Sequence, residues 1–223
     1  MKVEVKQTND GSHTLYVPAL NEHYHSVHGA LQEALHVFIK HGLEPVLANA
    51  TTPINLLEIG FGTGLNAILT LQAFLTQKHS VLYDTLEKYP LPEEVIAQLQ
   101  FENFILNPEL LAYFRKLHAA PWNTEAAIRP NFTLQKLHAD LENFALPANT
   151  YDLVYFDAFA PEKQPELWTD EIFAKIGQAL KPGGVLVSYC AKGSFKRSLK
   201  AAGLTVEALP GPPGKREMTR ARK

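Results

Sequence analysis

The spacing of hydrophobic and polar residues divides the chain into two parts. In the first part, residues 13–18 (HTLYVP) have the pattern of a short strand, and residues 30–41 repeat apolar side chains at helical spacing. The sequence Thr51-Thr52-Pro53 then interrupts the pattern. We therefore expect an N-terminal cap over residues 1–52 and a larger domain over residues 53–223.

Strands and helices alternate through the larger part. Apolar runs typical of buried parallel strands predict strands at residues 54–60, 81–87, 132–138, 151–159 and 185–190. Helical spacing predicts helices at residues 65–75, 92–118, 172–180 and 194–202. Two final strands, 204–209 and 216–222, are close enough to form a hairpin through the turn PGPPG. This alternation predicts an α/β fold with a doubly wound, mostly parallel sheet and one antiparallel edge strand.

Composition narrows the class of protein. The chain has 223 residues, of which 46% are hydrophobic and 20% charged, a balance that excludes a wholly disordered or fibrous protein. No apolar run approaches the roughly 18 residues of a membrane span, and the first ten residues contain no apolar secretory segment. The single cysteine, Cys190, excludes an internal disulfide and a four-cysteine zinc site. We expect a cytoplasmic protein with no membrane partner.

Charge is distributed unevenly along the chain. The formal net charge is −2, but residues 191–223 contain nine Lys and Arg and only two acids. A basic end on an acidic body is either a surface for a polyanion or a solubilising tail, and charge alone does not choose between them. The basic residues lie in two groups, one at helical spacing and one on or beside the last strand: Lys192, Lys196, Arg197 and Lys200, then Lys215, Arg216, Arg220 and Arg222.

A glycine-rich segment, Glu58-Ile59-Gly60-Phe61-Gly62-Thr63-Gly64, follows the first parallel strand and precedes a helix. Glycines at such a place permit a tight turn and close approach of a ligand, and the helix N-terminus favours anionic groups. The dinucleotide fingerprint requires a further glycine where Leu65 stands, and no Gly-Lys-Ser/Thr of a P-loop is present. The segment is therefore either a loop for another ligand or a structural turn.

Three acidic residues favour the ligand. Glu58 precedes the glycines, Glu87 ends the second parallel strand and Asp140 follows the third. All three are expected at the carboxyl edge of the sheet, where ligands bind in open α/β folds. Glu87 is placed to accept hydrogen bonds from ribose hydroxyls and Asp140 from an adenine amino group. Each acid alone is equally a strand end or a helix cap, but the three together predict a nucleoside ligand.

A second motif, DAFAPEKQPELW at residues 157–168, follows the fourth parallel strand. Two prolines make it a stiff loop, and its acid, aromatic rings and lysine suit a planar polar substrate. The alternative is a well-packed loop in which Asp157 caps the next helix.

These motifs resemble a known family. EIGFGTG is the pattern of class I S-adenosylmethionine-dependent methyltransferases. Together with GFGTGLN (60–66), LEK (86–88), the 157–168 motif, KPGG (181–184) and KREM (215–218), it resembles the MnmC-type tRNA methyltransferase domain in its stand-alone, MnmD-like form. The oxidase half of the bifunctional enzymes is not expected in this chain, so another route must supply the aminomethyl group.

The resemblance implies a Rossmann-like, seven-stranded sheet whose last strand is antiparallel, S-adenosyl-L-methionine as cofactor, and the tRNA anticodon arm as partner. The implied reaction is N-methylation of the 5-aminomethyl group of wobble (2-thio)uridine, giving 5-methylaminomethyl-2-thiouridine. A small-molecule or protein methyltransferase on the same fold, and a non-catalytic RNA-binding module, are the alternatives.

Particular residues follow from the resemblance and the motifs. The expected cofactor residues are Glu58, Gly60, Gly62, Gly64, Asn66, Glu87, Lys88 and Asp140. Asp157 is the expected catalytic residue, which either takes the proton of the amine or only orients it. Substrate contacts are expected from Phe159, Pro161, Lys163 and Trp168, and phosphate contacts from Lys196, Arg197, Lys215 and Arg216.

Histidines are dense in NEHYHSVH at residues 21–28. Their spacing fits no zinc pattern, and no cysteine or clear carboxylate completes a set, so no metal is expected. The segment is either a loop of hydrogen-bonded histidines or a lid over the cofactor.

Overall fold

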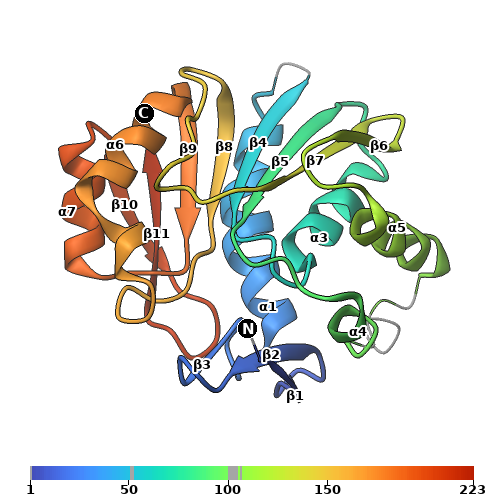
Figure 1. The fold of residues 1–223 in the computed structure, drawn as a ribbon. Coiled ribbons are helices and arrows are strands. Elements are labelled where there is room, and N and C mark those ends of the chain that lie inside the picture. Colours follow the sequence, from blue (N-terminus) through green and yellow to red (C-terminus); the bar gives the residue numbers. More distant parts are fainter. Residues whose placement is uncertain (1, 51–52, 100–104, 106) are drawn as a thin grey trace.

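The eight-stranded sheet at the centre of the protein positions the candidate site (Figure 1). The computed structural model describes residues 2–50, 53–99, 105 and 107–223. The strand order is β10-β11-β9-β8-β4-β5-β7-β6. Its strands are β4 (Ile54–Ile59), β5 (Val81–Glu87), β6 (Glu125–Arg129), β7 (Phe132–His138), β8 (Tyr151–Phe156), β9 (Leu180–Ser188), β10 (Thr205–Pro210) and β11 (Glu217–Arg222). The five central strands are parallel, which confirms the predicted Rossmann-like α/β class.

Two details of the sheet differ from the prediction of seven strands. The additional strand, β6, pairs antiparallel with β7. Its sequence, EAAIR, is short, and only Ile128 is buried, so it carries no clear strand pattern. The antiparallel strand β11 lies between β9 and β10 rather than at the edge. It occupies the interior position because it buries Met218, Thr219 and Ala221, whereas no residue of β10 is fully buried.

Helices cover both faces of the sheet, because successive apolar side chains of the central strands point to opposite faces and both faces must be buried. In β8, Leu153 and Tyr155 face one hydrophobic cluster, while Val154 and Phe156 face the other. The first face carries α1 (Ala30–Ala34), the π-helix η1 (Leu35–Leu43), α2 (Glu44–Leu47), α3 (Leu65–Phe74) and α5 (Pro108–Ala119). The second face carries α6 (Asp170–Ala179) and α7 (Gly193–Ala201).

The helical part of the N-terminal segment shares the core of the sheet. At Gly42, a Cβ atom would lie 2.8 Å from Val187 Cγ2, so only glycine allows η1 this close to β9. The division into residues 1–52 and 53–223 stays a prediction, and Thr51 and Thr52 lie outside the described residues. In the predicted helix 92–118 the structure contains α4 (Glu93–Ile96) and α5, with residues 100–104 and 106 outside the description.

A small antiparallel sheet lies beside the carboxyl ends of the central strands (Figure 1). It consists of β1 (Glu4–Gln7), β2 (His13–Val17) and β3 (Glu22–His23), so the predicted strand at 13–18 is confirmed. Lys163 links the 157–168 loop to the segment before β3, because its Nζ donates a hydrogen bond to the carbonyl oxygen of Leu20 at 2.8 Å. Within the described residues, no helix is both long and apolar enough to cross a membrane.

Candidate functional site

The glycine loop between β4 and α3 is held in conformations that favour glycine. Gly60, Gly62 and Gly64 have φ angles of +93°, +50° and +74°. A Cβ atom on Gly60 would also lie 2.8 Å from the backbone oxygen of Asp157, at the end of β8. The loop therefore packs directly against the second motif, and substitution of Gly60 would disturb both.

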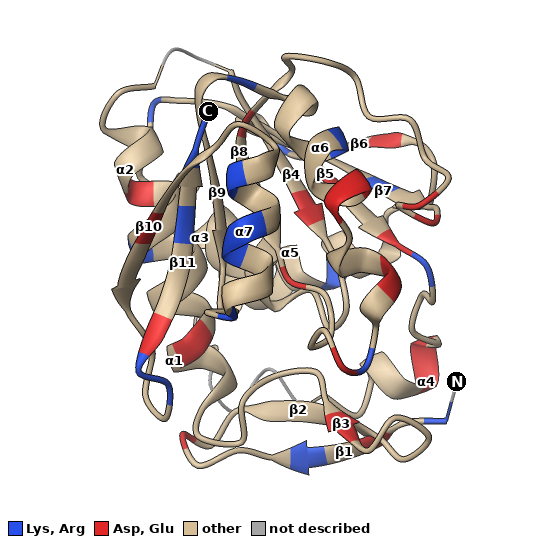
Figure 2. Cartoon of the chain, turned by 90° about the vertical axis from the view of Figure 1, so that its left-hand side faces the viewer, with Lys and Arg blue, Asp and Glu red and all other residues tan. Residues whose placement is uncertain are grey.

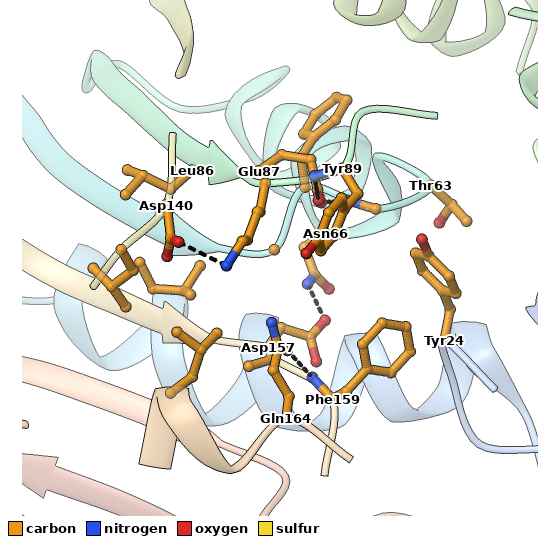
Figure 3. A pocket seen from close by; sticks show the side chains of 18 of the residues that line it. Tyr24, Thr63, Asn66, Leu86, Glu87, Tyr89, Asp140, Asp157, Phe159 and Gln164 are labelled. Atoms are coloured by element: carbon orange, nitrogen blue, oxygen red, sulfur yellow. Dashed lines mark hydrogen bonds and ion pairs between the residues drawn. The ribbon is translucent and has the colours of Figure 1, made fainter. Parts of the chain in front are cut away.

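The loop forms one wall of a pocket at the carboxyl edge of the sheet (Figure 3). Apolar side chains and the carboxylates of Glu87 and Asp140 line this pocket, a combination that suits a nucleoside-like ligand. Glu87 lies at the end of β5, where its Oε2 accepts from the backbone N–H of Gly62 at 3.1 Å and its Oε1 from that of Tyr89 at 2.7 Å. These two bonds fix the carboxylate against the glycine loop and leave acceptor capacity on each oxygen.

Asp140 and Lys88 lie together in the same pocket. Lys88 Nζ is 2.6 Å from Asp140 Oδ2, and the backbone N–H of Glu142 donates to Asp140 Oδ1 at 3.1 Å. Desolvation raises the pKa of Asp140, but the contacts with Lys88 and the Glu142 amide outweigh it, so the net pKa is below its ordinary value. Asp140 is therefore an ionised acceptor in the pocket.

Asp157 is the first residue of the 157–168 loop and lies against the glycine loop, where the main chain leaves β8. Its Oδ2 accepts from Asn66 Nδ2 at 2.8 Å, as Figure 3 shows. Burial raises the pKa of Asp157 to about 7, Glu33 adds to the rise, and Asn66 and Lys215 oppose it. Within the described residues Oδ1 has no hydrogen-bond partner, so this oxygen is available to a ligand.

Glu58 is placed differently from the other acids. It is 0% exposed and is not among the residues that line the pocket. Its Oε2 accepts from Thr85 Oγ1 at 2.7 Å, while Glu58 Oε1 and the nearby Asn66 Oδ1 have no partner among the described residues. Burial raises the pKa of Glu58 to about 8. A neutral carboxyl group there can donate its proton to one of the unpaired acceptors.

The histidine-rich segment covers the mouth of the pocket. Tyr24 and His25 line it, and the Tyr24 ring meets Phe159 edge-on, with ring centroids 4.9 Å apart. His25 Nδ1 lies 3.2 Å from Thr14 Oγ1, and burial lowers the pKa of His25 to about 4. In the part of the chain that the structure describes, no group of three His, Cys, Asp or Glu could hold a metal. Tyr24 and His25 line the pocket as expected of a lid, and the contact of His25 with Thr14 also fits the alternative of a loop of hydrogen-bonded histidines.

The predicted substrate residues of the second motif have several different surroundings. Phe159 lines the pocket. Trp168 packs against Phe156 and Phe195 in the hydrophobic cluster under α6 and α7, and its Nε1 donates to the Phe159 oxygen at 2.8 Å. Pro161 lines a second hollow, together with Lys215 and Arg216. Trp168 thus supports the loop rather than the pocket surface.

The basic end is only partly available to a polyanion (Figure 2). Lys196 Nζ lies 2.9 Å from Glu217 Oε2, and Lys215 forms an ion pair with Glu33. Arg197 and Arg216 are exposed. Four other basic residues also contact protein groups: Lys192 on Glu162, Arg220 and Arg222 on Glu207, and Lys223 on backbone and side-chain oxygens.

Several residues near Asp157 were not predicted from the sequence. Glu33, on α1, is 7% exposed and raises the pKa of Asp157. Tyr189 OH donates to the Ala158 oxygen at 2.8 Å, and Gln164 Oε1 accepts from the Phe159 N–H at 3.2 Å. Glu33 could have been noticed as an acid on the buried side of a predicted helix, but no motif points to Tyr189.

Comparisons with known proteins agree with this geometry. Residues 110–223 match a family model described as S-adenosyl-L-methionine-dependent methyltransferase. The tRNA 5-methylaminomethyl-2-thiouridine biosynthesis bifunctional protein MnmC of Magnetococcus marinus is 32% identical over 214 residues, which cover 93% of this chain and 32% of that protein. The MnmC protein of Cupriavidus metallidurans is 30% identical over 227 residues, with coverages of 96% and 33%. The chain thus spans about a third of the length of these relatives.

A solved structure is similar over nearly the whole chain. The crystal structure of MNMC2 from Aquifex aeolicus has a TM-score of 0.79 and 27% sequence identity, and the match covers 99% of this chain and 69% of that one. The match includes the N-terminal segment and the glycine loop, which lie outside the matched part of the family model.

Proposed function

Because the chain belongs to the family of S-adenosyl-L-methionine-dependent methyltransferases, we propose that it methylates the 5-aminomethyl group of wobble (2-thio)uridine in tRNA. The product is 5-methylaminomethyl-2-thiouridine, and the reaction takes place in the cytoplasm. The observation that carries this proposal is the position of Asp157. Asp157 lines the same pocket as the glycine loop and Glu87, and its Oδ1 has no hydrogen-bond partner among the described residues. The names of the MnmC relatives support the choice of substrate.

The pocket fits the cofactor by its own chemistry. Gly60 and Gly62 line the pocket in backbone conformations that favour glycine, and Thr63 Oγ1 is a buried hydroxyl without a partner among the described residues. We assign Gly60, Gly62, Gly64 and Asn66 to the loop side of the cofactor. Glu87 would accept from the ribose hydroxyls, and Asp140, held by Lys88, from the adenine amino group. When bound, the cofactor supplies a methyl group already activated on a sulfonium.

The main task of the protein is to present a neutral amine. An alkylamine is largely protonated at pH 7, and its lone pair must be freed before it can take the methyl group. Asn66 fixes Oδ2 of Asp157, so that Oδ1 accepts a hydrogen bond from the amine and directs its lone pair. With a pKa raised to about 7 by burial, the carboxyl group can also take the proton that the ammonium releases. The freed lone pair forms the new N–C bond, so the nitrogen leaves the reaction as a secondary ammonium ion.

Cations near the pocket would receive the phosphates of the anticodon arm. Arg197 on α7 and Arg216 before β11 are exposed, and we assign the phosphate contacts chiefly to them. Lys196 and Lys215, paired with Glu217 and Glu33, contribute less of their charge. Phe159 remains the candidate for contact with the base, while Pro161, Lys163 and Trp168 hold its loop in place.

The proposal is tested by incubating the protein with labelled S-adenosyl-L-methionine and tRNA that carries the 5-aminomethyl group, with and without the 2-thio group. Nucleosides from the digested tRNA are then analysed by mass spectrometry. We expect label in 5-methylaminomethyluridine species and none in tRNA that lacks the aminomethyl group. Label found only in other nucleosides would contradict this substrate. Label found in a small molecule or a protein, with none in tRNA, would favour the alternative substrate classes.

A further inference from the structure

A hollow on the outer side of Asp157 has a composition that the cofactor does not explain. It is lined by residues from the lid, α1, the 157–168 loop, the segment after β9 and the segment before β11. We call it the acceptor hollow and define it by Tyr24, Phe159, Tyr189, Glu22, Glu33 and Lys215. It shares Tyr24, His25 and Phe159 with the cofactor pocket, so the two cavities meet at the lid. Figure 3 shows Tyr24 and Phe159 together on the side of Asp157 away from Asp140.

The walls of the acceptor hollow are aromatic. Tyr24 and Phe159 meet edge-on at 4.9 Å between ring centroids. Tyr189 is fixed by the hydrogen bond from its hydroxyl to the Ala158 oxygen, at 2.8 Å. Rings held in this way present flat apolar surfaces, on which an unstacked nucleobase can lie.

The acceptor hollow has more acidic than basic side chains, although it borders the basic end of the chain, whose exposed Arg197 and Arg216 we call the basic rim. Glu22 and Glu33 line it, and Asp157 lines the adjoining cofactor pocket. Lys215 is the one lysine or arginine among the described residues that line it. His25 adds no positive charge at neutral pH, because burial lowers its pKa to about 4. A hollow with this balance favours a cation over a neutral or anionic group.

Lys215 already shows how the hollow binds an alkylammonium group. Its Nζ forms an ion pair with Glu33 and lies 4.0 Å from the centroid of the Tyr189 ring. A carboxylate and an aromatic face are the two partners that stabilise an organic ammonium ion. The aminomethyl substituent of a modified pyrimidine carries the same chemical group on a shorter stem.

We propose that the acceptor hollow is the subsite for the modified base, and that Glu33 recognises its positively charged aminomethyl group before the group reaches Asp157. The inference rests on the proposed function and extends it to the selection of the substrate. The Glu33 carboxylate contacts both Lys215 and the incoming ammonium group. Tyr24, Phe159 and Tyr189 enclose the ring of the base. tRNA without the aminomethyl group makes the same phosphate contacts but lacks a partner for Glu33.

The test compares the binding of two tRNAs that differ only in the aminomethyl group, in the presence of S-adenosylhomocysteine, so that no methyl transfer occurs. For the unchanged protein we expect a preference of about tenfold for the aminomethyl tRNA. Glu33→Gln should reduce this preference to about onefold while the affinity for S-adenosylhomocysteine is retained. Lys215→Met removes the competing ammonium and should increase the preference.

Lys181→Met is the matched control. Lys181 pairs with Asp152 and its side chain is 33% exposed, compared with 31% for Lys215, but it lies outside the acceptor hollow. This variant should bind both tRNAs like the unchanged protein. The inference is overturned if Glu33→Gln keeps the preference, including by weakening both tRNAs equally, or if Lys215→Met does not raise the preference. Should Glu33→Gln fail to fold, the rise expected for Lys215→Met decides. If the unchanged protein methylates no tRNA, the proposed function itself fails.

Discussion

Replacing Glu58 with glutamine should change how the stability of the protein depends on pH. Glu58 is 0% exposed, and burial raises its pKa to about 8, against a value of 4.5 for the unperturbed group. The folded state therefore holds the proton that the unfolded chain releases above pH 4.5. The stabilisation of the folded state by the protonated Glu58 is fully present below pH 4.5 and is lost as the pH rises through 8.

The size of the stability change follows from the difference between the pKa values of Glu58 in the folded and unfolded states. Each pH unit between the two pKa values changes the free energy of unfolding by about 1.4 kcal/mol, so about 4 kcal/mol should be lost between pH 5 and pH 8. The glutamine side chain has the same shape and does not titrate, and its amide can donate to the unpaired Asn66 Oδ1. At pH 8 the Glu58→Gln variant should therefore be more stable than the unchanged protein, while at pH 5 the two should be similar.

Urea unfolding at several pH values measures this difference, with the fluorescence of the two tryptophans as the signal. Titration of all other groups cancels when the two proteins are compared. Because Asp157 is coupled to Glu58, the series is repeated in an Asp157→Asn background. A difference in unfolding free energy that stays constant from pH 5 to pH 8 would refute the assignment of a neutral, buried Glu58.

Three further variants test the pocket and the rim. Glu87→Ala should weaken S-adenosyl-L-methionine binding at least tenfold by calorimetry, because a charge-assisted pair of hydrogen bonds to the ribose is removed, and NAD should not bind. Asp157→Asn should lower the single-turnover rate about a hundredfold or more with nearly unchanged cofactor affinity; an unchanged rate would contradict its role. Arg197→Glu combined with Arg216→Glu should lower tRNA affinity and reduce the salt slope by about 0.7 for each phosphate that the variant no longer neutralises; an unaltered slope would remove these residues from tRNA docking.

Most of the residues predicted for the cofactor line one pocket, but tertiary packing places one predicted site residue in the core. Glu87, Asp140 and Asp157 do lie together, since the carboxyl ends of parallel strands share one edge. Glu58 precedes the glycines in sequence but points into the core between β5 and α3, which strand alternation alone did not reveal. Its role as a direct cofactor contact is therefore not supported by its position.

Charge counts along the sequence could not reveal ionic pairing. Lys196 and Lys215 belong to the basic end, yet Lys215 pairs with Glu33, 182 positions earlier. That pairing depends on the packing of α1 beside the turn before β11, which no local pattern encodes. Similarly, β11 lies inside the sheet because its side chains, unlike those of β10, become buried against β9.

The opposite charges of the rim and the acceptor hollow should respond differently to salt. At 0.15 M ionic strength the screening length is about 8 Å, so exposed cations such as Arg197 and Arg216 lose much of their attraction for phosphate as salt rises. Glu33 is only 7% exposed, and its interaction with a bound ammonium is screened much less. Raising salt from 50 to 200 mM should therefore weaken binding of both tRNAs by at least tenfold while the preference for the aminomethyl tRNA changes less than twofold. Equilibrium binding of both tRNAs across this range measures the ratio. A preference that falls in parallel with affinity would mean that the rim, not the hollow, selects the substrate.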